Sequence, residues 1–337
     1  MRRTLIFFGL VFALTVTAVQ AQAQTSDASP DQRDAAGLLT RTQSAARTLS
    51  YAGTFVYQQG NQVRTSRVTH VVDGKIESEK LEILDGKPRE YIRNGDEITY
   101  YVPEAKTLVI EKRVSQEVFP AILAASPAEL AEFYTIKKTA NGRVAGFECQ
   151  TVLLSPKDRL RYGYRLCAEK ASGLLLRAQT LNQDGEIIEQ IAFTQIAIGN
   201  IDRRATKSSY INTAGWHIEN SIATQATASG WVVKNIPPGF KKTRELKRLV
   251  SDAAVSNAAS SAQTARREVI QIVYSDGLAA ISVFVEPGTQ SRTEGSLQQG
   301  AMNIVGKRQG DFWLTIVGEV PLAAITQVAS SIEFKSK

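Results

Sequence analysis

The stretch SRVTHVVDGKIESEKLEILDGKPREYIRNGDEITYYV, residues 66–102, decides the fold class. In it, short runs rich in β-branched and aromatic residues alternate with the turn dipeptides Asp73-Gly74, Asp85-Gly86 and Asn94-Gly95. Asp-Gly and Asn-Gly are strong hairpin signals, because a type I′ turn requires positive φ at both of its central residues. The stretch therefore predicts antiparallel strands that follow one another through tight hairpins.

The same pattern continues on both sides of this stretch. Further turn dipeptides occur at Gly60-Asn61, Asn141-Gly142 and Asp184-Gly185. So many hairpins in series predict an antiparallel meander of roughly ten or eleven strands, interrupted by a helix-prone insert at residues 119–133. Ahead of the meander, apolar positions at helical spacing predict one amphipathic helix. These positions are Ala35, Leu38, Leu39, Thr42, Ala45, Ala46 and Leu49.

The meander needs more cover than one helix and a short insert can supply. We therefore expect residues 30–199 to form an antiparallel half-barrel that curls around the helix. Its concave side is either a filled core or an apolar cavity, and the sequence leaves both open. Strand alternation places aromatic residues on one face. If there is a cavity, the candidates to bind an acyl chain are Phe55, Tyr57, Tyr162 and Tyr164.

The strand predicted from Arg159 has a basic row opposite its tyrosines. Arg159, Arg161 and Arg165 alternate with Tyr162 and Tyr164, so the two sets should lie on opposite faces. RNA-binding sheets instead interleave basic and aromatic residues on one face. This strand therefore gives no support to nucleic-acid binding.

The second half of the chain has a different composition. Residues 200–230 are rich in small polar residues and are predicted to be a linker. Residues 231–337 are predicted to form a smaller α+β domain, with a helix at 321–332 that begins at a proline. The expected strands lie at 231–235, 241–249, 268–274, 278–285, 302–308 and 312–320. The predicted fold class is thus α+β and mainly β, in two domains.

The densest basic segment begins the second of these strands. Lys241, Lys242, Arg244 and Lys247 are candidates to bind an acidic partner or a phosphate group. Lysines also protect the edge strands of sheets from aggregation, and this interpretation is equally compatible with the segment.

Composition excludes several classes of function. The 337 residues carry 40 Lys plus Arg against 33 Asp plus Glu, a mild and scattered excess that argues against a nucleic-acid binder. Two cysteines cannot form a four-cysteine zinc site. The sequence contains no G-x-S-x-G, P-loop, H-E-x-x-H or C-x-x-C motif. We therefore predict no catalytic residue, no metal, no cofactor and no enzymatic activity.

The N-terminus indicates export. Arg2 and Arg3 precede an apolar run at residues 5–19, and small residues follow at Ala21 and Ala23. This is the pattern of a cleaved signal peptide, here residues 1–23, with cleavage after Ala21 or Ala23. An uncleaved anchor is the alternative, although the run is short for a bilayer span, which takes ~20 residues. The mature protein is expected in the periplasm.

Export permits a disulfide bond. Cys149 and Cys167 lie in two apolar runs that flank a turn signal centred on Asp158. A hairpin folded there would place the two cysteines opposite each other, so we predict that they are bonded. Two buried free thiols are the alternative.

Several segments resemble the MucB/RseB family. They are SYAGTFVY at 50–57, EYIRNG at 90–95, Gly239-Phe240 after a double proline, YSDGLAAISVFV at 274–285 and WLTIVGEVP at 313–321. The resemblance covers nearly the whole mature chain in order. It implies a LolA-like half-barrel and a periplasmic negative regulator of a sigma-E type (AlgU-type) envelope-stress response.

The resemblance also implies a partner and a ligand. Family members bind the periplasmic region of a MucA/RseA-like membrane anti-sigma factor and shield it from a site-1 protease. Lipid or lipopolysaccharide is expected to bind the N-terminal domain and to release the partner. The anti-sigma factor is then expected to bind the domain at 231–337. A homo-oligomer is possible. The alternatives are a periplasmic lipid or lipoprotein carrier of the LolA type and, with no supporting motif, an envelope hydrolase.

Overall fold

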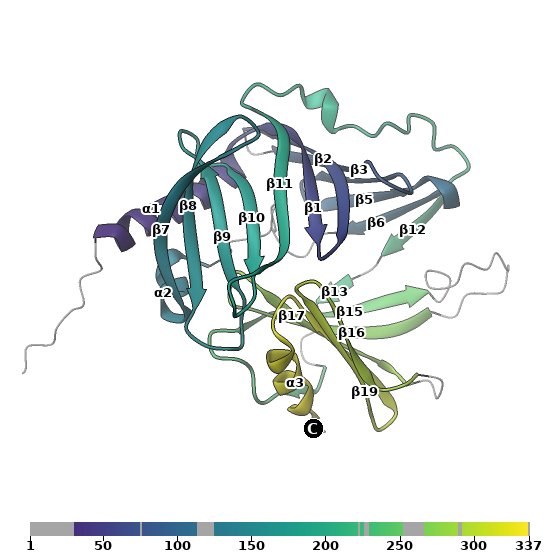
Figure 1. Ribbon diagram of the computed structural model, residues 1–337. Coiled ribbons are helices and arrows are strands. Elements are labelled where there is room, and N and C mark those ends of the chain that lie inside the picture. Colours follow the sequence, from purple (N-terminus) through teal and green to yellow (C-terminus); the bar gives the residue numbers. More distant parts are fainter. Residues whose placement is uncertain are drawn as a thin grey trace, which may run out of the picture.

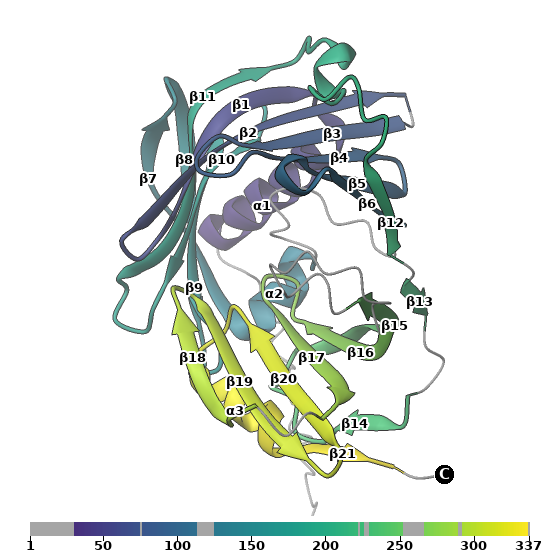
Figure 2. The ribbon, with the colours of Figure 1, turned by 90° about the vertical axis from the view of Figure 1, so that its right-hand side faces the viewer.

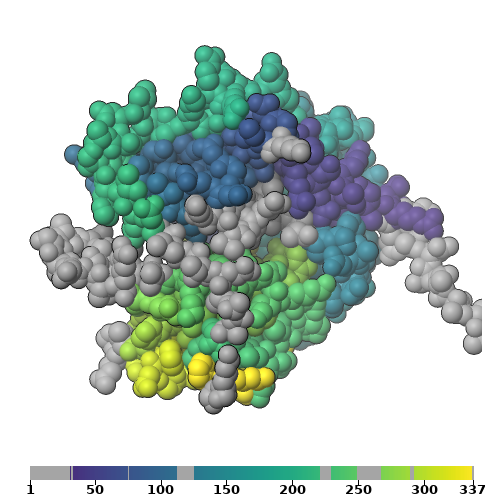
Figure 3. All heavy atoms as spheres, turned by 180° about the vertical axis from the view of Figure 1, so that it is seen from behind, coloured from purple at the N-terminus to yellow at the C-terminus, as the bar shows by residue number. Residues whose placement is uncertain are grey.

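The computed structural model describes residues 30–74, 76–112, 125–221, 223–225, 229–251, 266–288 and 292–335. The predicted signal peptide lies outside the described residues, as does the first part of the predicted insert. Two sheets dominate the structure, one above the other in Figure 1. Figure 3 shows from behind the parts of the chain that contain them, purple to teal above and green to yellow below.

The first sheet is an antiparallel meander with one added parallel strand. Its order is β12-β6-β5-β4-β3-β2-β1-β11-β10-β9-β8-β7. The strands are β1 (Tyr51–Gln59), β2 (Gln62–Asp73), β3 (Ile76–Ile83), β4 (Arg89–Asn94), β5 (Glu97–Val102), β6 (Thr107–Lys112), β7 (Tyr134–Val144), β8 (Phe147–Pro156), β9 (Gly163–Glu169), β10 (Leu175–Leu181), β11 (Ile187–Ile198) and β12 (His217–Ser221). The strands β1–β11 agree with the predicted meander.

Most predicted hairpin turns form, and one does not. Gly74 and Gly95 adopt φ of 60° and 57°, the left-handed region that these turns require. Asn141-Gly142 instead lies inside β7, where the register with β8 shifts between Thr139 and Gly142. The prediction of a turn there was wrong, because the chain turns later, at Ala145 and Gly146. Asn-Gly is also compatible with a β-bulge, in which one strand of a pair contains an extra residue.

The first sheet curls around its helices without closing. Helix α1 (Pro30–Thr48) lies inside the curve, close to α2 (Pro127–Phe133), as Figure 2 shows. Ala35, Leu38 and Leu39 of α1 are buried in a cluster with Leu154 and Tyr164. The sheet ends at β12 on one side and β7 on the other, which do not pair. The predicted half-barrel with a covering helix is confirmed. We call this sheet with α1 and α2 the first domain.

The second sheet has the order β13-β15-β16-β17-β20-β19-β18. Its strands are β13 (Ala223–Gln225), β15 (Lys241–Ser251), β16 (Arg266–Ser275), β17 (Ala280–Pro287), β18 (Gly295–Gln299), β19 (Met302–Gln309) and β20 (Phe312–Gly318). Helix α3 (Leu322–Ser330) packs on it, beside the small pair β14 (Trp231–Val233) and β21 (Ile332–Phe334). Ile281, Leu314 and Ile325 are fully buried in one core. We call this part the second domain.

The predicted linker is largely bound to the sheets. It contains the short 3-10 helix η2 (Arg203–Thr206), and a second one, η1 (Pro103–Ala105), lies between β5 and β6. The Lys80 Nζ donates a hydrogen bond to Ser209 Oγ at 2.9 Å, and Ser208 Oγ donates to Glu90 Oε2 at 2.7 Å. Strand β12 then pairs with β6, and β13 with β15. Small polar residues that bind a sheet by hydrogen bonds have the same composition as a free linker, so the sequence did not reveal this.

Candidate functional site

The two domains meet at a buried arginine. Arg161 lies in the turn between β8 and β9 and has no solvent exposure. Its predicted place in a strand from Arg159 was wrong, because β9 begins only at Gly163. Asp158 stabilises this turn, because its Oδ1 accepts a hydrogen bond from the Leu160 amide at 2.9 Å. The Arg161 side chain therefore lies in the interface between the two domains, and not in the predicted basic row.

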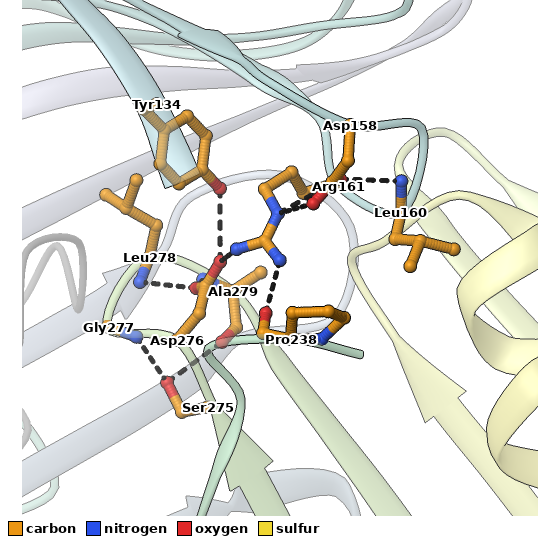
Figure 4. Close-up of polar contacts among 10 residues, drawn as sticks. All are labelled: Tyr134, Asp158, Leu160, Arg161, Pro238, Ser275, Asp276, Gly277, Leu278 and Ala279. Carbon is orange, nitrogen blue, oxygen red and sulfur yellow. Dashed lines mark hydrogen bonds and ion pairs between the residues drawn. The ribbon is translucent and has the colours of Figure 1, made fainter. Parts of the chain in front are cut away.

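Both domains supply acceptors to this guanidinium (Figure 4). Nε of Arg161 lies 3.1 Å from Asp158 Oδ2 within the first domain. Nη1 lies 3.0 Å from Oδ2 of Asp276, in the turn between β16 and β17 of the second domain. Nη2 donates to the carbonyl of Pro238. All three nitrogens thus have an acceptor, which a buried charge requires.

Asp276 is held in place from both sides. Its Oδ1 accepts the amides of Leu278 and Ala279 at 3.0 and 2.9 Å, so its own turn fixes the carboxylate. Its Oδ2 also accepts the hydroxyl of Tyr134, at 3.2 Å. Burial raises the pKa of Tyr134, so this phenol stays protonated and remains a donor. Two residues of the first domain, Arg161 and Tyr134, therefore both donate to Oδ2 of Asp276 in the second domain.

Aromatic rings enclose the ion pair. The Arg161 guanidinium carbon lies 4.7 Å from the centre of the Phe133 ring and 5.4 Å from that of Phe240. These distances are in the range of cation–π attraction. The backbone also approaches closely here: a Cβ on Gly277, whose φ is 93°, would lie 2.1 Å from the Cβ of Ala125. We call Tyr134, Asp158, Arg161, Pro238 and Asp276 the arginine joint.

A second contact between the domains involves Tyr162, the residue next to Arg161 in the chain. Asn303 Nδ2 donates to Tyr162 Oη at 3.1 Å and to the Val320 carbonyl at 2.9 Å. Nearby, the Ala301 amide donates to Glu189 Oε2 at 3.4 Å. We call Tyr162, Glu189, Asn303 and Glu319 the carboxylate contact, because it brings an acid of each domain together.

Glu319 is unusual in this contact. Its burial among protein atoms, and then the charge of Glu189, raise its pKa to about 7. Its side chain nevertheless keeps access to solvent. Glu319 can therefore change its charge near neutral pH at the boundary between the domains.

The structure does not bring the four predicted acyl-chain residues together. Phe55 is buried against Phe193, with 5.9 Å between ring centres. Tyr164 is buried in a different cluster, 6.3 Å from Tyr134. Tyr162 belongs to the carboxylate contact, and Tyr57 is half-buried. In this conformation three of the four are covered, so any acyl site there requires rearrangement.

The predicted basic residues lie on β15 and have intramolecular partners. Lys242 pairs with Glu245 and Lys247 with Glu268, each at 2.9 Å. Lys241 reaches Glu129 of the first domain at 3.0 Å. Arg244 lies on the same strand, opposite Val273. Beyond β15 lies only the three-residue β13 among the described strands, so β15 is nearly an edge strand.

The predicted disulfide is present. Cys149 and Cys167 are bonded, with 5.4 Å between their Cα atoms. They lie diagonally across β8 and β9, since Cys149 opposes Glu169 and Cys167 opposes Thr151. The hairpin is thus centred one residue beyond Asp158, and diagonal pairs on one face remain within reach.

The described residues hold no cluster of metal ligands and no helix that could span a membrane. No three His, Cys, Asp or Glu side chains there are grouped as metal ligands. No helix in the described ranges is long and apolar enough to cross a membrane. The sequence reasoning missed the arginine joint; its one signal was the dipeptide Asp276-Gly277, a turn motif that carries no hint of an ion pair.

A curled, open sheet joined to a smaller sheet through buried polar and apolar contacts defines the class: a two-domain, mainly β protein. Comparisons with known proteins identify the family. Residues 34–214 match the MucB/RseB N-terminal domain and residues 225–333 match the MucB/RseB C-terminal domain. The chain therefore belongs to the MucB/RseB family, which is regulatory and not enzymatic.

Relatives match over nearly their full length. The sigma factor AlgU regulatory protein MucB of Pseudomonas aeruginosa is 30% identical over 315 residues, covering 89% of this chain and 90% of that protein. The sigma-E factor regulatory protein RseB of Haemophilus influenzae is 25% identical over 314 residues, covering 92% of this chain and 95% of that protein.

A solved structure resembles the whole fold. The crystal structure of MucB in complex with MucA(peri) aligns with a TM-score of 0.67 at 27% identity, covering 90% of this chain and 100% of that chain. A second MucA/MucB complex from Pseudomonas aeruginosa has a TM-score of 0.68, at the same identity and coverage.

Proposed function

We propose that this protein is a periplasmic regulator that binds the periplasmic region of a membrane anti-sigma factor. In this role it shields the anti-sigma factor from site-1 proteolysis and releases it when lipid or lipopolysaccharide binds. The observation that carries the proposal is the match of both domains, in order, to MucB, which has been solved in complex with MucA(peri). The disulfide supports an exported protein, because such bonds persist in oxidising compartments.

The domains have separate roles in this proposal. The half-barrel at 30–199 senses lipid, and residues 231–337 bind the anti-sigma factor, with 200–230 between them. A shield that uses both domains needs them in a fixed relative placement. The arginine joint and the carboxylate contact supply specific polar bonds for this placement, and Leu278 of the second domain packs into the core of the first.

Release by lipid follows from linkage. The candidate acyl-chain residues Phe55, Tyr162 and Tyr164 are covered here, so a lipid must favour a rearranged conformation. A ligand shifts an equilibrium only by its difference in affinity between two states. Each CH2 group moved from water into an apolar site contributes ~0.8 kcal/mol, so a long acyl chain can outweigh contacts at the joint. The same coupling weakens partner binding by an equal free energy.

Calorimetric titration tests partner binding directly. The mature protein is titrated with the purified periplasmic region of the anti-sigma factor from the same genome. We expect saturable binding, and release of the partner when an acylated lipid is added. Binding of lipid without any binding of the anti-sigma region would favour a carrier of the LolA type instead.

Variants locate the lipid site. Phe55→Asp and Tyr164→Asp place a charge where an acyl chain cannot solvate it. If still folded, they should keep the partner bound at lipid concentrations that release it from the wild type. Normal release by both folded variants would place the lipid elsewhere.

A further inference from the structure

A pocket of about 560 Å3 lies on the first domain, between the linker and strands β3 to β5. Figure 2 shows the linker on the side of the sheet away from α1, so this pocket is separate from the concave face. The volume falls within the ~300–1,000 Å3 typical of small-molecule sites. Neither the family comparison nor the proposed function assigns it a ligand.

The rim of the pocket is cationic. Arg203, Arg204 and Lys207 line it, and no carboxylate does. Arg203 pairs with Asp73 at 3.2 Å and Arg204 with Asp202 at 2.8 Å, and all four side chains are more than half exposed. Such exposed pairs are weak, so both guanidinium groups can turn to a ligand. Lys207 forms no ion pair with any residue in the described part of the chain.

The floor of the pocket carries a hydroxyl group that is open to the pocket. Ser78 is only 3% exposed, yet its hydroxyl makes no hydrogen bond to a described residue. Its oxygen is not among the fully enclosed polar atoms, so it opens to the pocket, where a ligand can bond it. Asn94 beside it, opposite Ser78 in the ladder of β3 and β4, also has its side-chain amide unused by described residues.

We propose that this pocket binds a small organic anion that carries a phosphate or carboxylate group together with hydroxyl groups. Arg203, Arg204 and Lys207 neutralise the charge, and Ser78 and Asn94 bond the hydroxyls. The cations come from the linker and the polar floor from β3 and β4, so a bound anion adds to the hydrogen bonds that already hold the linker on the sheet. This inference is independent of the proposed function, because it requires neither an anti-sigma factor nor an acyl chain.

Titration calorimetry of the mature protein tests the pocket with three probes on related skeletons. Glucose 6-phosphate carries a phosphate, gluconate a carboxylate, and glucose no charge. At constant ionic strength we expect saturable binding of at least one anion and none of glucose. Whichever anion binds identifies the preferred group. Loss of tryptic cleavage after Arg203 and Arg204 at saturation would show that the linker is fastened.

Two pocket variants and one matched control complete the test. Lys207→Gln and Ser78→Ala should each weaken anion binding by ~10-fold, the effect of losing one hydrogen bond to a charged group. Ser78→Ala should fold normally, because it removes a hydroxyl that bonds no described residue. Lys138→Gln makes the same charge change on β7, away from the pocket, and should leave binding unchanged. Equal affinity in all variants, equal binding of glucose, or no binding of either anion would overturn the proposal.

Discussion

At the scale of single residues, Arg161 makes the joint both stable and sensitive. A buried charge with every nitrogen bonded is tolerated, whereas the same charge with one acceptor removed is strongly unfavourable. Arg161 depends on Asp276 and Pro238 of the second domain for two of its bonds. Separation of the domains would leave the Arg161 charge without two of its acceptors. We therefore expect the bonds of the arginine joint to break in one cooperative step.

Replacing Asp276 tests this dependence. Asp276→Asn keeps the shape of the side chain but removes the charge opposite Arg161. We expect the free energy of unfolding to fall by about 3 kcal/mol, because Asp158 alone then compensates the buried cation. Urea unfolding followed by tryptophan fluorescence measures the change. Arg159→Gln removes an exposed arginine from the same turn and should change stability by less than about 0.5 kcal/mol. Equal effects of the two variants would mean that the joint contributes nothing.

From the raised pKa of Glu319 we predict that its contribution to the free energy of unfolding changes with pH in the opposite direction from that of most acids. Its folded pKa of about 7 lies above the ordinary 4.5, so the folded state binds the proton more tightly than the unfolded state. Its contribution to stability is therefore complete below about pH 4.5 and is lost as the pH rises to 7. Since the side chain retains solvent access, we expect a loss of about 1 kcal/mol or less.

The Glu319→Gln variant isolates this contribution. It should be more stable than the wild type at pH 8 and should lack the fall in stability between pH 5 and pH 8. Glu294→Gln, which removes an exposed acid elsewhere in the second domain, serves as the control. Parallel stability curves for the wild type and Glu319→Gln across this range would contradict the assignment.

At the scale of elements, hairpins were predictable and contacts between distant segments were not. Asp73-Gly74 and Asn94-Gly95 encode their turns locally, because glycine permits the required φ. The disulfide followed from two cysteines on either side of one turn. By contrast, Arg161 and Asp276 are 115 positions apart, and only the folded chain brings them together. The four acyl-chain candidates were chosen by alternation along their strands, but they lie in separate clusters. Alternation predicts which face of a strand a side chain occupies, and not which other residues it contacts.

The disulfide joins the β8–β9 hairpin, and its loss should be measurable. Reduction, or the paired change of Cys149 and Cys167 to alanine, should lower the free energy of unfolding by ~3 kcal/mol in the chain-entropy model. Thermal unfolding with and without reductant measures this. A free-thiol assay on unfolded, unreduced protein should find none, and two reactive thiols would show that the bond does not form.

Strand β15 tests how the basic residues act. We expect the combined replacement of Lys241, Lys242, Arg244 and Lys247 by glutamine to weaken binding of the anti-sigma region. The loss should be greater at low salt than at high salt, because salt screens exposed charges. Affinity that is unchanged at low ionic strength would instead support the protection of a near-edge strand, a role that the short β13 leaves necessary.

At the scale of the whole molecule, the two domains are joined by polar bonds as well as by apolar packing such as that of Leu278. The bonds between Arg161 and Asp276 depend on the relative placement of the two domains, so they are lost together when that placement changes. We propose that the anti-sigma factor favours the joined placement and that lipid favours a rearranged one. The two ligands then oppose each other without sharing a site.

The rate at which the site-1 protease cleaves the anti-sigma periplasmic region tests this account most directly. The measurement is made on the region alone, with excess mature protein, and with mature protein plus an acylated lipid. We predict that the protein slows cleavage and that lipid restores the rate of the region alone, while Phe55→Asp, if folded, slows cleavage but does not respond to lipid. Cleavage at the same rate with and without the protein would contradict the account.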